Sequence, residues 1–371
     1  MKSVHDGVWL FLDSSSIGGI ETHVMQLACG LASMGVNTTL ALYQAYQGSP
    51  VPELLHDLKD SDQSGLLHLH ILDGRPTGLY HLLRAHTPPA LIHTHGYKAG
   101  LIGRLTGRLS GIPIASTWHA GEVPVGLVRL YDFLDRYSAF LAQLRFAVSP
   151  QIQARLPASA QVMDNFVDLS DLRLSTGQQL AFVGRLSHEK GPDVMSELAS
   201  LMPEQVFHMY GGGEMEAGLQ QSAPDNLQLH GMQTNMKPVW EQVGLMVMPS
   251  RFEGLPMAVL EAMARGIPVV ASDVGALSSV IRNGENGWLV TPADATALSQ
   301  AIQHWLALPE DSQQRIRQAA RQAIEERFSS TAVIPEFIAA YQSVAPELDW
   351  NQPAGASPHA ASNEPQSRNN A

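Results

Sequence analysis

Short apolar segments alternate with helical patterns along most of the chain, and this alternation constrains the fold more than any other feature. Residues 7–12 and 38–43 are strand-like, and residues 19–34 between them have helical periodicity. Further strands are predicted at 67–72, 90–93, 112–117 and 145–148, and further helices at 77–86, 97–110 and 125–144. A strand, helix, strand rhythm is typical of a parallel sheet covered by helices. We therefore expect residues 1–163 to form one doubly wound α/β domain.

The rhythm restarts after a loop-like stretch at 157–171, so residues 164–330 are expected to form a second domain of the same class. Its predicted strands lie at 179–183, 205–210, 226–229, 244–248, 267–270 and 287–290. Its predicted helices lie at 191–201, 213–221, 234–242, 256–265 and 276–282, and two or three more are expected within 293–345. Two such halves place a ligand cleft between them, at the carboxyl ends of their strands.

Charge and composition exclude several classes of protein. The chain has 35 acidic and 23 basic residues and a net charge of −12, which argues against a nucleic-acid partner. Its one cysteine, Cys29, cannot form an internal disulfide, so nothing requires an oxidising compartment and the cytoplasm is expected. No apolar run approaches the ~18 residues that span a bilayer, so membrane contact would be peripheral. Residues 346–371 have few large apolar side chains, and we expect a disordered tail.

The first candidate site is the segment 13–21, which follows the first strand and opens the first helix. Gly18 and Gly19 lie in it, and the N–H groups of a glycine-rich turn at a helix start can bind an anion. The alternative is an ordinary turn in which the glycines only relieve crowding. The segment is neither a G-x-G-x-x-G nor a Walker motif, so a nicotinamide or ATP site is not favoured.

The second candidate is the segment 182–191, which ends a strand and enters a helix. Arg185 and Lys190 lie five residues apart beside two glycines. This spacing lets a guanidinium and an ammonium converge on one phosphate group. The alternative is a loop with two solvated charges.

The third candidate, residues 249–266, is the most specific. Gly254 permits a turn, Pro256 suits the first helical turn and Gly266 suits the end, so the pattern predicts a helix over 256–265. Glu253 precedes this helix and Glu261 lies eight residues later. Carboxylates accept hydrogen bonds from hydroxyls, so the pair could hold two hydroxyl groups of one elongated ligand. The alternative is a capping carboxylate with a solvated helix residue.

Histidines follow two strands of the first half, in His93-Thr-His95 and Thr117-Trp-His119. They suggest a metal, but no cysteine lies nearby and no Asp-x-Asp or His-Glu-x-x-His motif completes a site, so no metal is expected. His119 is instead expected in the cleft as a hydrogen-bonding group. Local or surface roles are expected for four other histidines, His68, His70, His81 and His86.

Taken together, these motifs resemble family 4 of the retaining glycosyltransferases, which are nucleotide-sugar-dependent enzymes with the GT-B fold. The similarity runs from about residue 7 to residue 345, and the spacing from Glu253 to Glu261 is its most specific part. The other matching segments are Gly18 to Glu21, His93-Thr-His95, Trp118-His119, Asn165 to Asp168, Val183 to Leu186, Glu189 to Gly191 and Gly211 to Glu214. The resemblance implies two Rossmann-like domains facing a cleft, with residues 331–345 crossing back to the first, acceptor-side domain.

The resemblance also implies residue roles. Arg185 and Lys190 would hold the donor diphosphate, Glu253 the hydroxyls of the transferred sugar and Glu261 the ribose hydroxyls. His119 would lie beside the anomeric carbon. The residues Trp118-His119-Ala differ from the His-Asp or His-Gly that is commoner in the family after this strand. The remaining donor-binding residues would be Gly18, Gly19, Tyr210, Gly211, Gly231, Met232, Gly254, Leu255 and Met257. No cofactor is implied.

These features favour a metal-independent hexosyltransferase that uses a UDP- or GDP-hexose and a glycan or lipid-linked glycan acceptor in polysaccharide or lipopolysaccharide assembly. An epimerase of nucleotide sugars on the same fold and a non-catalytic nucleotide-sugar-binding protein are the alternatives. The predicted helix 97–110 places Arg104 and Arg108 on one face beside leucines, which could meet an anionic lipid surface at the inner face of the membrane. A surface helix with two solvated arginines is favoured over that interpretation.

Overall fold

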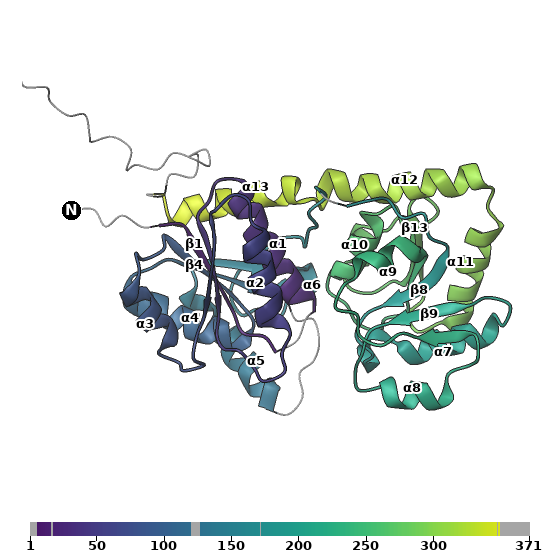
Figure 1. Ribbon diagram of the computed structural model, residues 1–371, viewed down its shortest axis with the longest axis horizontal. Coiled ribbons are helices and arrows are strands. Elements are labelled where there is room, and N and C mark those ends of the chain that lie inside the picture. Colours follow the sequence, from purple (N-terminus) through teal and green to yellow (C-terminus); the bar gives the residue numbers. More distant parts are fainter. Residues whose placement is uncertain (1–5, 16–17, 120–126, 171, 347, 349–371) are drawn as a thin grey trace, which may run out of the picture.

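The computed structural model describes residues 6–15, 18–119, 127–170, 172–346 and 348, and Figure 1 shows them in two α/β halves. The first half has a parallel seven-stranded sheet in the order β3-β2-β1-β4-β5-β6-β7. Its strands are β1 (Val8–Leu12), β2 (Thr38–Leu42), β3 (Leu67–Ile71), β4 (Leu91–His95), β5 (Ile114–Trp118), β6 (Leu144–Ala147) and β7 (Gln161–Val162). Its helices are α1 (Gly19–Ser33), α2 (Val51–Ser61), α3 (Gly78–Ala85), α4 (Tyr97–Ser110), α5 (Leu127–Tyr137), the 3-10 turn η1 (Ala139–Leu141) and α6 (Pro150–Gln153).

The second half has a parallel six-stranded sheet in the order β10-β9-β8-β11-β12-β13. Its strands are β8 (Gln179–Val183), β9 (Phe207–Tyr210), β10 (Leu227–Leu229), β11 (Val243–Met248), β12 (Val269–Ser272) and β13 (Gly287–Val290). Its helical elements are η2 (His188–Lys190), α7 (Pro192–Leu201), α8 (Glu216–Ser222), α9 (Lys237–Gln242), α10 (Met257–Met263), η3 (Leu277–Ser279), α11 (Ala295–Ala307) and α12 (Glu310–Arg327).

Strand order reverses between β1 and β4 in the first sheet and between β8 and β11 in the second. Ligands of open parallel sheets bind at such switch points, outside the carboxyl ends of the strands. The residues that follow β5, β8 and β11 therefore lie where a ligand is expected. The predicted fold class, two doubly wound domains of the GT-B type, is confirmed.

The last helix, α13 (Ser330–Val344), returns to the first half, and Figure 1 shows it in yellow above α1. Ile334, Phe337 and Tyr341 are buried in the same apolar cluster as strands β1 and β2. Gly30 of α1 makes this packing close, because a β-carbon there would lie 2.6 Å from Ile334. From these contacts we propose to divide the chain into domains at 1–163 and 164–330, with 331–345 as the returning helix.

Two predicted helices differ from the structure, and helix α2 was not predicted at all. Helix α2 occupies a segment for which no element was predicted, and it buries only Val51 and Leu55, so its apolar signal is weak. The predicted helix 125–144 is wrong in its second part, because α5 ends at Tyr137 and β6 begins at Leu144. The predicted helix 276–282 is only the short turn η3. The predicted tail, apart from Pro346 and Leu348, lies outside the described residues.

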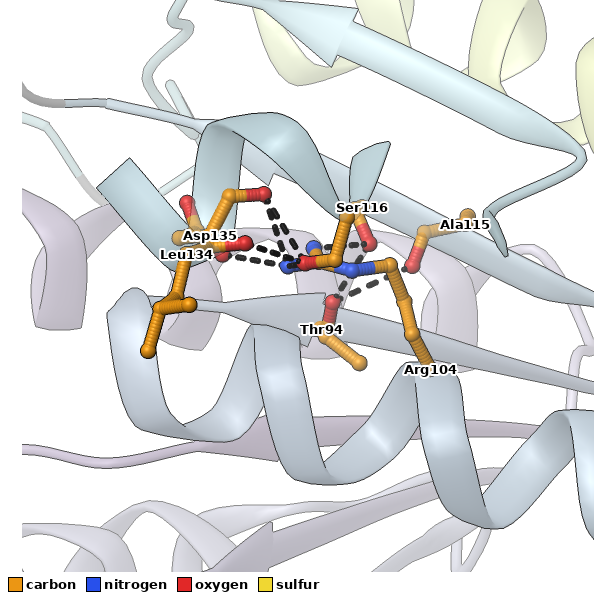
Figure 2. Close-up of polar contacts among 7 residues, drawn as sticks. Thr94, Arg104, Ala115, Ser116, Leu134 and Asp135 are labelled. Carbon is orange, nitrogen blue, oxygen red and sulfur yellow. Dashed lines mark hydrogen bonds and ion pairs between the residues drawn. The ribbon is translucent and has the colours of Figure 1, made fainter. Parts of the chain in front are cut away.

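The prediction that Arg104 is a solvated surface residue is wrong. Its side chain is 1% exposed, and Figure 2 shows it enclosed between α4 and the chain around Asp135. Its guanidinium donates to the carboxylate of Asp135 at 2.6 Å and to the hydroxyl of Ser116 at 3.1 Å. Arg108, one turn later, is exposed as predicted. Helix α4 therefore turns one arginine inward, because a buried carboxylate on α5 faces it.

Among the described residues, no helix is long and apolar enough to cross a bilayer.

Candidate functional site

Lys190 and Glu253 form an ion pair in the segments that follow β8 and β11. The Lys190 ammonium lies 2.6 Å from one carboxylate oxygen of Glu253, and the Ser250 hydroxyl donates to the other at 2.7 Å. The side chains of Lys190 and Glu253 are only 20% and 3% exposed. The second and third candidate motifs thus contact each other, although these two residues are 63 positions apart in the chain. The contact places a cation beside an anion.

The two loops that carry this pair are held together by further contacts. Arg251 donates two hydrogen bonds to the carboxylate of Asp193 and one to the carbonyl of His188. The pKa of Asp193 is lowered, chiefly by the hydrogen bond from Arg251. At Gly191, whose φ is +68°, a β-carbon would lie 2.3 Å from the carbonyl oxygen of Pro249. These contacts fix the position of Lys190 relative to Glu253.

Arg185 lies on the same loop but is more open. Its side chain is 57% exposed and lies 3.2 Å from Glu189. Its charge acts on Glu21 of α1 in the first domain. Burial raises the pKa of the Glu21 carboxyl, and a hydrogen bond with Ser14 and the charge of Arg185 oppose that shift. The guanidinium of Arg185 is therefore open to a ligand that lies between the two domains.

The segment from Gly254 to Met257 brings the two domains together. A β-carbon on Gly254 would lie 3.9 Å from the carbonyl oxygen of His119, and one on Gly19 would lie 3.7 Å from Met257. The side chains of Leu255 and Met257 are buried. The backbone N–H groups of Gly254, Leu255 and Met257 have no hydrogen-bond partner among the described residues. These groups are therefore available to an oxygen-rich ligand.

Gly18 precedes the first residue of α1, and Gly19 begins that helix. A β-carbon on Gly18 would lie 3.2 Å from a carboxylate oxygen of Glu21. Ser16 and Ile17 of the predicted anion-binding segment lie outside the described residues.

Glu261 lies on α10, in contact with a residue that the sequence did not single out. The indole nitrogen of Trp240 donates to its carboxylate at 3.1 Å, and the guanidinium of Arg265 donates to its backbone carbonyl at 2.8 Å. Burial raises the pKa of the Glu261 carboxyl, against the charge of Arg265 and the Trp240 hydrogen bond. The structure places Glu261 and Glu253 at opposite ends of one short segment, as the spacing predicts.

The glycine-rich ends of β9 and β10 lie together. The N–H of Gly211 donates to the carbonyl of Gly231 at 2.9 Å, and Met232 is 60% exposed. Gly211 has a φ of +142°, and a β-carbon there would lie 1.8 Å from the carbonyl oxygen of Gly184. The side chain of Tyr210 is buried, stacks on His230 and donates to Gln179. The side chain of Tyr210 is therefore engaged elsewhere, and its backbone is the part that a ligand at the ends of β9 and β10 could contact.

Three histidines form the first domain's part of the site. His119 follows β5, His95 ends β4 and His23 lies on α1, and a ring nitrogen of His95 lies 3.0 Å from one of His119. The ring of His23 lies 4.8 Å from that of His119, edge to face. Sequence motifs indicated His119, but His23 was not singled out, because only the order β1-β4-β5 brings α1 beside β4 and β5.

These imidazoles are held neutral. Burial lowers the pKa of His23 to about 4. Burial also lowers the pKa values of His95 and His119 well below the usual range, and the neighbouring imidazoles lower them further. His93, behind them, bonds the hydroxyls of Tyr341 and Thr117, each at 2.7 Å. These three histidines therefore contribute no charge to the site.

Ligand atoms of His23, His95 and His119 all lie within 4.8 Å of one another, so the described residues include one group that could hold a metal ion. Neutral imidazole nitrogens are ligands of zinc and related ions. One ring nitrogen of His95 and one of His119 already bond each other. The absence of a metal therefore stays a prediction.

A surface pocket of about 410 Å³ lies at the opposite edge of the first sheet, near the starts of β1 and β2 and along β3. Lys59 and His68 are among its lining residues. His70 and His86 also line it, with their ring centres 4.7 Å apart, in agreement with the local role predicted for them. None of the residues of the three sequence motifs lines this pocket, so we place the functional site at the cleft instead.

Two models of known protein families match most of the chain. Residues 18–165 match the model of the glycosyl transferase 4-like domain, and residues 171–323 match that of the glycosyl transferases group 1. The two matches together span most of both domains, including Lys190, Glu253 and the three histidines of the cleft.

Relatives and solved structures are similar over most of the chain. A D-inositol 3-phosphate glycosyltransferase of Mycobacterium leprae is 25% identical and covers 92% of each chain. An Escherichia coli UDP-Gal:alpha-D-GlcNAc-diphosphoundecaprenol alpha-1,3-galactosyltransferase is 24% identical over 57% of this chain and 65% of its own length. Anabaena HepE, solved with UDP and glucose, superimposes with a TM-score of 0.75 at 18% identity, over 91% of this chain and 100% of that one. The chain belongs to the group 1 glycosyltransferases, with a glycosyl transferase 4-like first domain and the GT-B fold.

Proposed function

We propose that this protein is a retaining, metal-independent hexosyltransferase that moves a hexose from a nucleoside-diphosphate sugar to a glycan or lipid-linked glycan acceptor. The observation that carries the proposal is the buried pair of Lys190 and Glu253 beside the unpartnered N–H groups of Gly254 and Leu255. A cation, a hydroxyl acceptor and free amides at one place suit a ligand that joins a diphosphate to a sugar.

In this proposal the second domain supplies the charges. Lys190 and Arg185 bind the diphosphate and stabilise the negative charge that develops as it leaves. Electrostatic stabilisation of this kind usually contributes more to catalysis than any other single effect. Glu253 accepts hydrogen bonds from the sugar hydroxyls, and Glu261 accepts them from the ribose. The backbone around Tyr210, Gly211, Gly231 and Met232 encloses the base.

The first domain supplies the neutral wall. His119 lies beside the anomeric carbon as a neutral hydrogen-bonding group, and the turn at Gly18 and Gly19 approaches the diphosphate. The acceptor hydroxyl attacks the anomeric carbon from the face that the diphosphate leaves, and its proton passes to the departing phosphate oxygen. The step runs through an ion-pair-like state without a covalent enzyme intermediate. Closure of the domains over the donor excludes water from the activated sugar.

The acceptor is proposed from the relatives. The E. coli relative is named for a diphosphoundecaprenol-linked acceptor, which is a lipid-linked glycan. We propose a reaction of this class in polysaccharide or lipopolysaccharide assembly, with the protein in the cytoplasm, at the inner face of the membrane.

The test is a thermal-shift panel with UDP, GDP, ADP, their sugar conjugates and NAD, each with and without magnesium. A ligand at 100 times its dissociation constant stabilises the folded state by about 2.7 kcal/mol. We expect one nucleotide and its hexose conjugate to raise the melting temperature equally with and without magnesium. If no member of the panel shifts the transition, the donor site is wrongly assigned.

Turnover separates the proposal from its alternatives. Transfer to an added acceptor supports it, whereas formation of an epimer from the donor alone would identify an epimerase. Donor binding without turnover on a broad acceptor panel would identify a binding protein.

Metal independence has its own test. Turnover should survive dialysis against a strong chelator. If activity is lost and zinc restores it, the cluster of His23, His95 and His119 is a metal site instead.

A further inference from the structure

Helix α5 is oriented with its polar side inward. Its two acidic residues, Asp132 and Asp135, are 8% and 4% exposed. In contrast, Tyr131 and Phe133 beside them are 41% and 48% exposed, and Tyr137 is 56% exposed. A surface helix of a globular protein normally buries its apolar stripe. The reversed orientation indicates that the outer side of α5 has another environment.

A buried ion pair between α4 and α5 holds α5 in this orientation. Arg104 of α4 donates to the carboxylate of Asp135 at 2.6 Å, as Figure 2 shows. It also donates to the Ser138 hydroxyl at 2.9 Å. Arg136 also donates to Asp132, but this partly exposed pair lies within α5 and does not fix its orientation. Turning α5 over would leave the guanidinium of Arg104 buried without its partner, which is strongly unfavourable. The apolar side is therefore kept outward by specific contacts.

The outward side forms one apolar region with its neighbours. In the part of the chain that the structure describes, eight of the 15 exposed large apolar side chains lie on α4, α5 and η1. We call them the α4–α5 face: Leu105, Leu109, Leu130, Tyr131, Phe133, Leu134, Tyr137 and Phe140. Phe140 and Leu109 are the most open, at 72% and 81%. Clustered exposed side chains of this kind mark interaction sites, whereas single ones do not.

The charges around this face have one sign. Arg108 and Arg129 are exposed and form no ion pair among the described residues. Within their described ranges, the only acidic residues of α4, α5 and η1 are Asp132 and Asp135, which point inward. Helix α3, which packs on α4, has Arg84 and no acidic residue. The face is thus basic on a chain whose net charge is −12.

This combination favours an anionic lipid surface over a second copy of the chain. A symmetric dimer through this face would bring Arg108 and Arg129 of both copies together, with no carboxylate from these helices to compensate. An interfacial helix binds a bilayer with aromatic and aliphatic side chains inserted and basic side chains at the headgroups. Tyrosine is enriched at that boundary.

We propose that the α4–α5 face docks the protein on a bilayer that contains anionic lipids. The inference rests on the proposed function, because a lipid-linked acceptor would be presented at such a surface. Helix α5 follows β5, and His119 at the end of that strand belongs to the candidate site, so docking would bring the membrane to the acceptor side of the cleft.

Vesicle flotation of the full chain tests this inference. We expect binding to vesicles of phosphatidylcholine and phosphatidylglycerol at 3:1 and much weaker binding to phosphatidylcholine alone. The double variant Phe133→Ser, Phe140→Ser should lower the partition coefficient by about tenfold or more, because two inserted rings are lost. Arg108→Glu with Arg129→Glu should lower it by about tenfold on the anionic vesicles only, and added salt should have the same effect.

The matched control is Leu201→Ser with Val206→Ser, since these side chains of the second domain are 47% and 48% exposed. This control should bind vesicles as the unaltered chain does. Equal loss in the control, or no binding by the unaltered chain, overturns the proposal. So does a dimer in light scattering that Phe133→Ser, Phe140→Ser converts to a monomer.

Donor binding is measured in a separate assay, so that the proposed function and the docking proposal can each be refuted without the other. The phenylalanine variant should keep the nucleotide-dependent thermal shift and its transfer to a water-soluble acceptor. Vesicle binding by a chain that no nucleotide sugar stabilises would refute the proposed function and leave the docking face standing.

Discussion

The two walls of the cleft are built in opposite ways. On the second domain, Lys190 and Glu253 form a charged pair whose side chains are mostly buried, and each comes from a contiguous sequence motif. On the first domain, His23, His95 and His119 are neutral imidazoles that come from three separate elements. In the proposed function, this difference would divide the work, with the charged pair acting on the leaving diphosphate and the neutral histidines lining the place of the sugar.

The largest expected effect is on the charged wall. Lys190→Ala should lower kcat by about 10²-fold or more, because it removes a cation that stabilises charge in the transition state. Steady-state kinetics with the identified donor measures this. Lys237→Ala, an exposed lysine of α9, is the control and should leave kcat unchanged. Unchanged turnover in Lys190→Ala would remove Lys190 from the catalytic assignment.

A smaller effect is expected on the neutral wall. His95→Leu should lower kcat by about tenfold, because the ring nitrogen that contacts His119 at 3.0 Å is lost and His119 is no longer oriented. His95→Asn should recover most of the rate, since its amide can occupy the place of that nitrogen. The KM for the donor should change little in both variants. Equal kcat values for the leucine and asparagine variants would contradict a positioning role.

The next effect is on donor affinity. Glu261→Ala should raise the donor KM by about fivefold and leave kcat nearly unchanged, because a ribose contact is made equally in the ground state and the transition state. Glu285→Ala is the control, since that carboxylate is 67% exposed on a different loop. A defect confined to kcat would show that Glu261 does not hold the ribose.

The smallest effect is on stability as a function of pH. His23 has an unfolded pKa near 6.5 and a folded pKa of about 4, so the unfolded chain binds the proton first as the pH falls. Stability from this residue is present above pH 6.5 and is lost as the pH falls toward 4. Between pH 7 and pH 6 the loss is about 0.7 kcal/mol.

Chemical denaturation at a series of pH values measures that loss. His23→Leu should unfold with a shallower pH dependence than the unaltered chain over this interval. Comparing the two chains cancels the contribution of other groups, such as Asp135, whose pKa is raised to about 6 by burial and which therefore acts in the opposite direction. An identical pH dependence would mean that the pKa of His23 is the same in the folded and the unfolded protein.

Sequence analysis predicted the second domain's wall better than the first domain's. Glu253 and Glu261 share one helix and the turn before it, so their spacing along the chain is also their spacing in space. The contacts of His119 with His95 and of His93 with Tyr341 join residues 24 and 248 apart. Such contacts follow from the order of the strands and from the return of α13 to the first domain. Neither can be predicted from the local periodicity of the sequence. Trp240 was missed for the same reason, since it lies 21 residues before Glu261.

The amino-acid sequence by itself determined the alternation of strands and helices, and hence two parallel sheets, because side-chain periodicity is a local property. It also determined the segments in which Arg185, Lys190, Glu253 and Glu261 lie. Only the tertiary structure decided which side of α5 faces inward, since that depends on Arg104 of another helix meeting Asp135. It also decided that three histidines meet at one wall, because the order of the strands and not their sequence makes them neighbours.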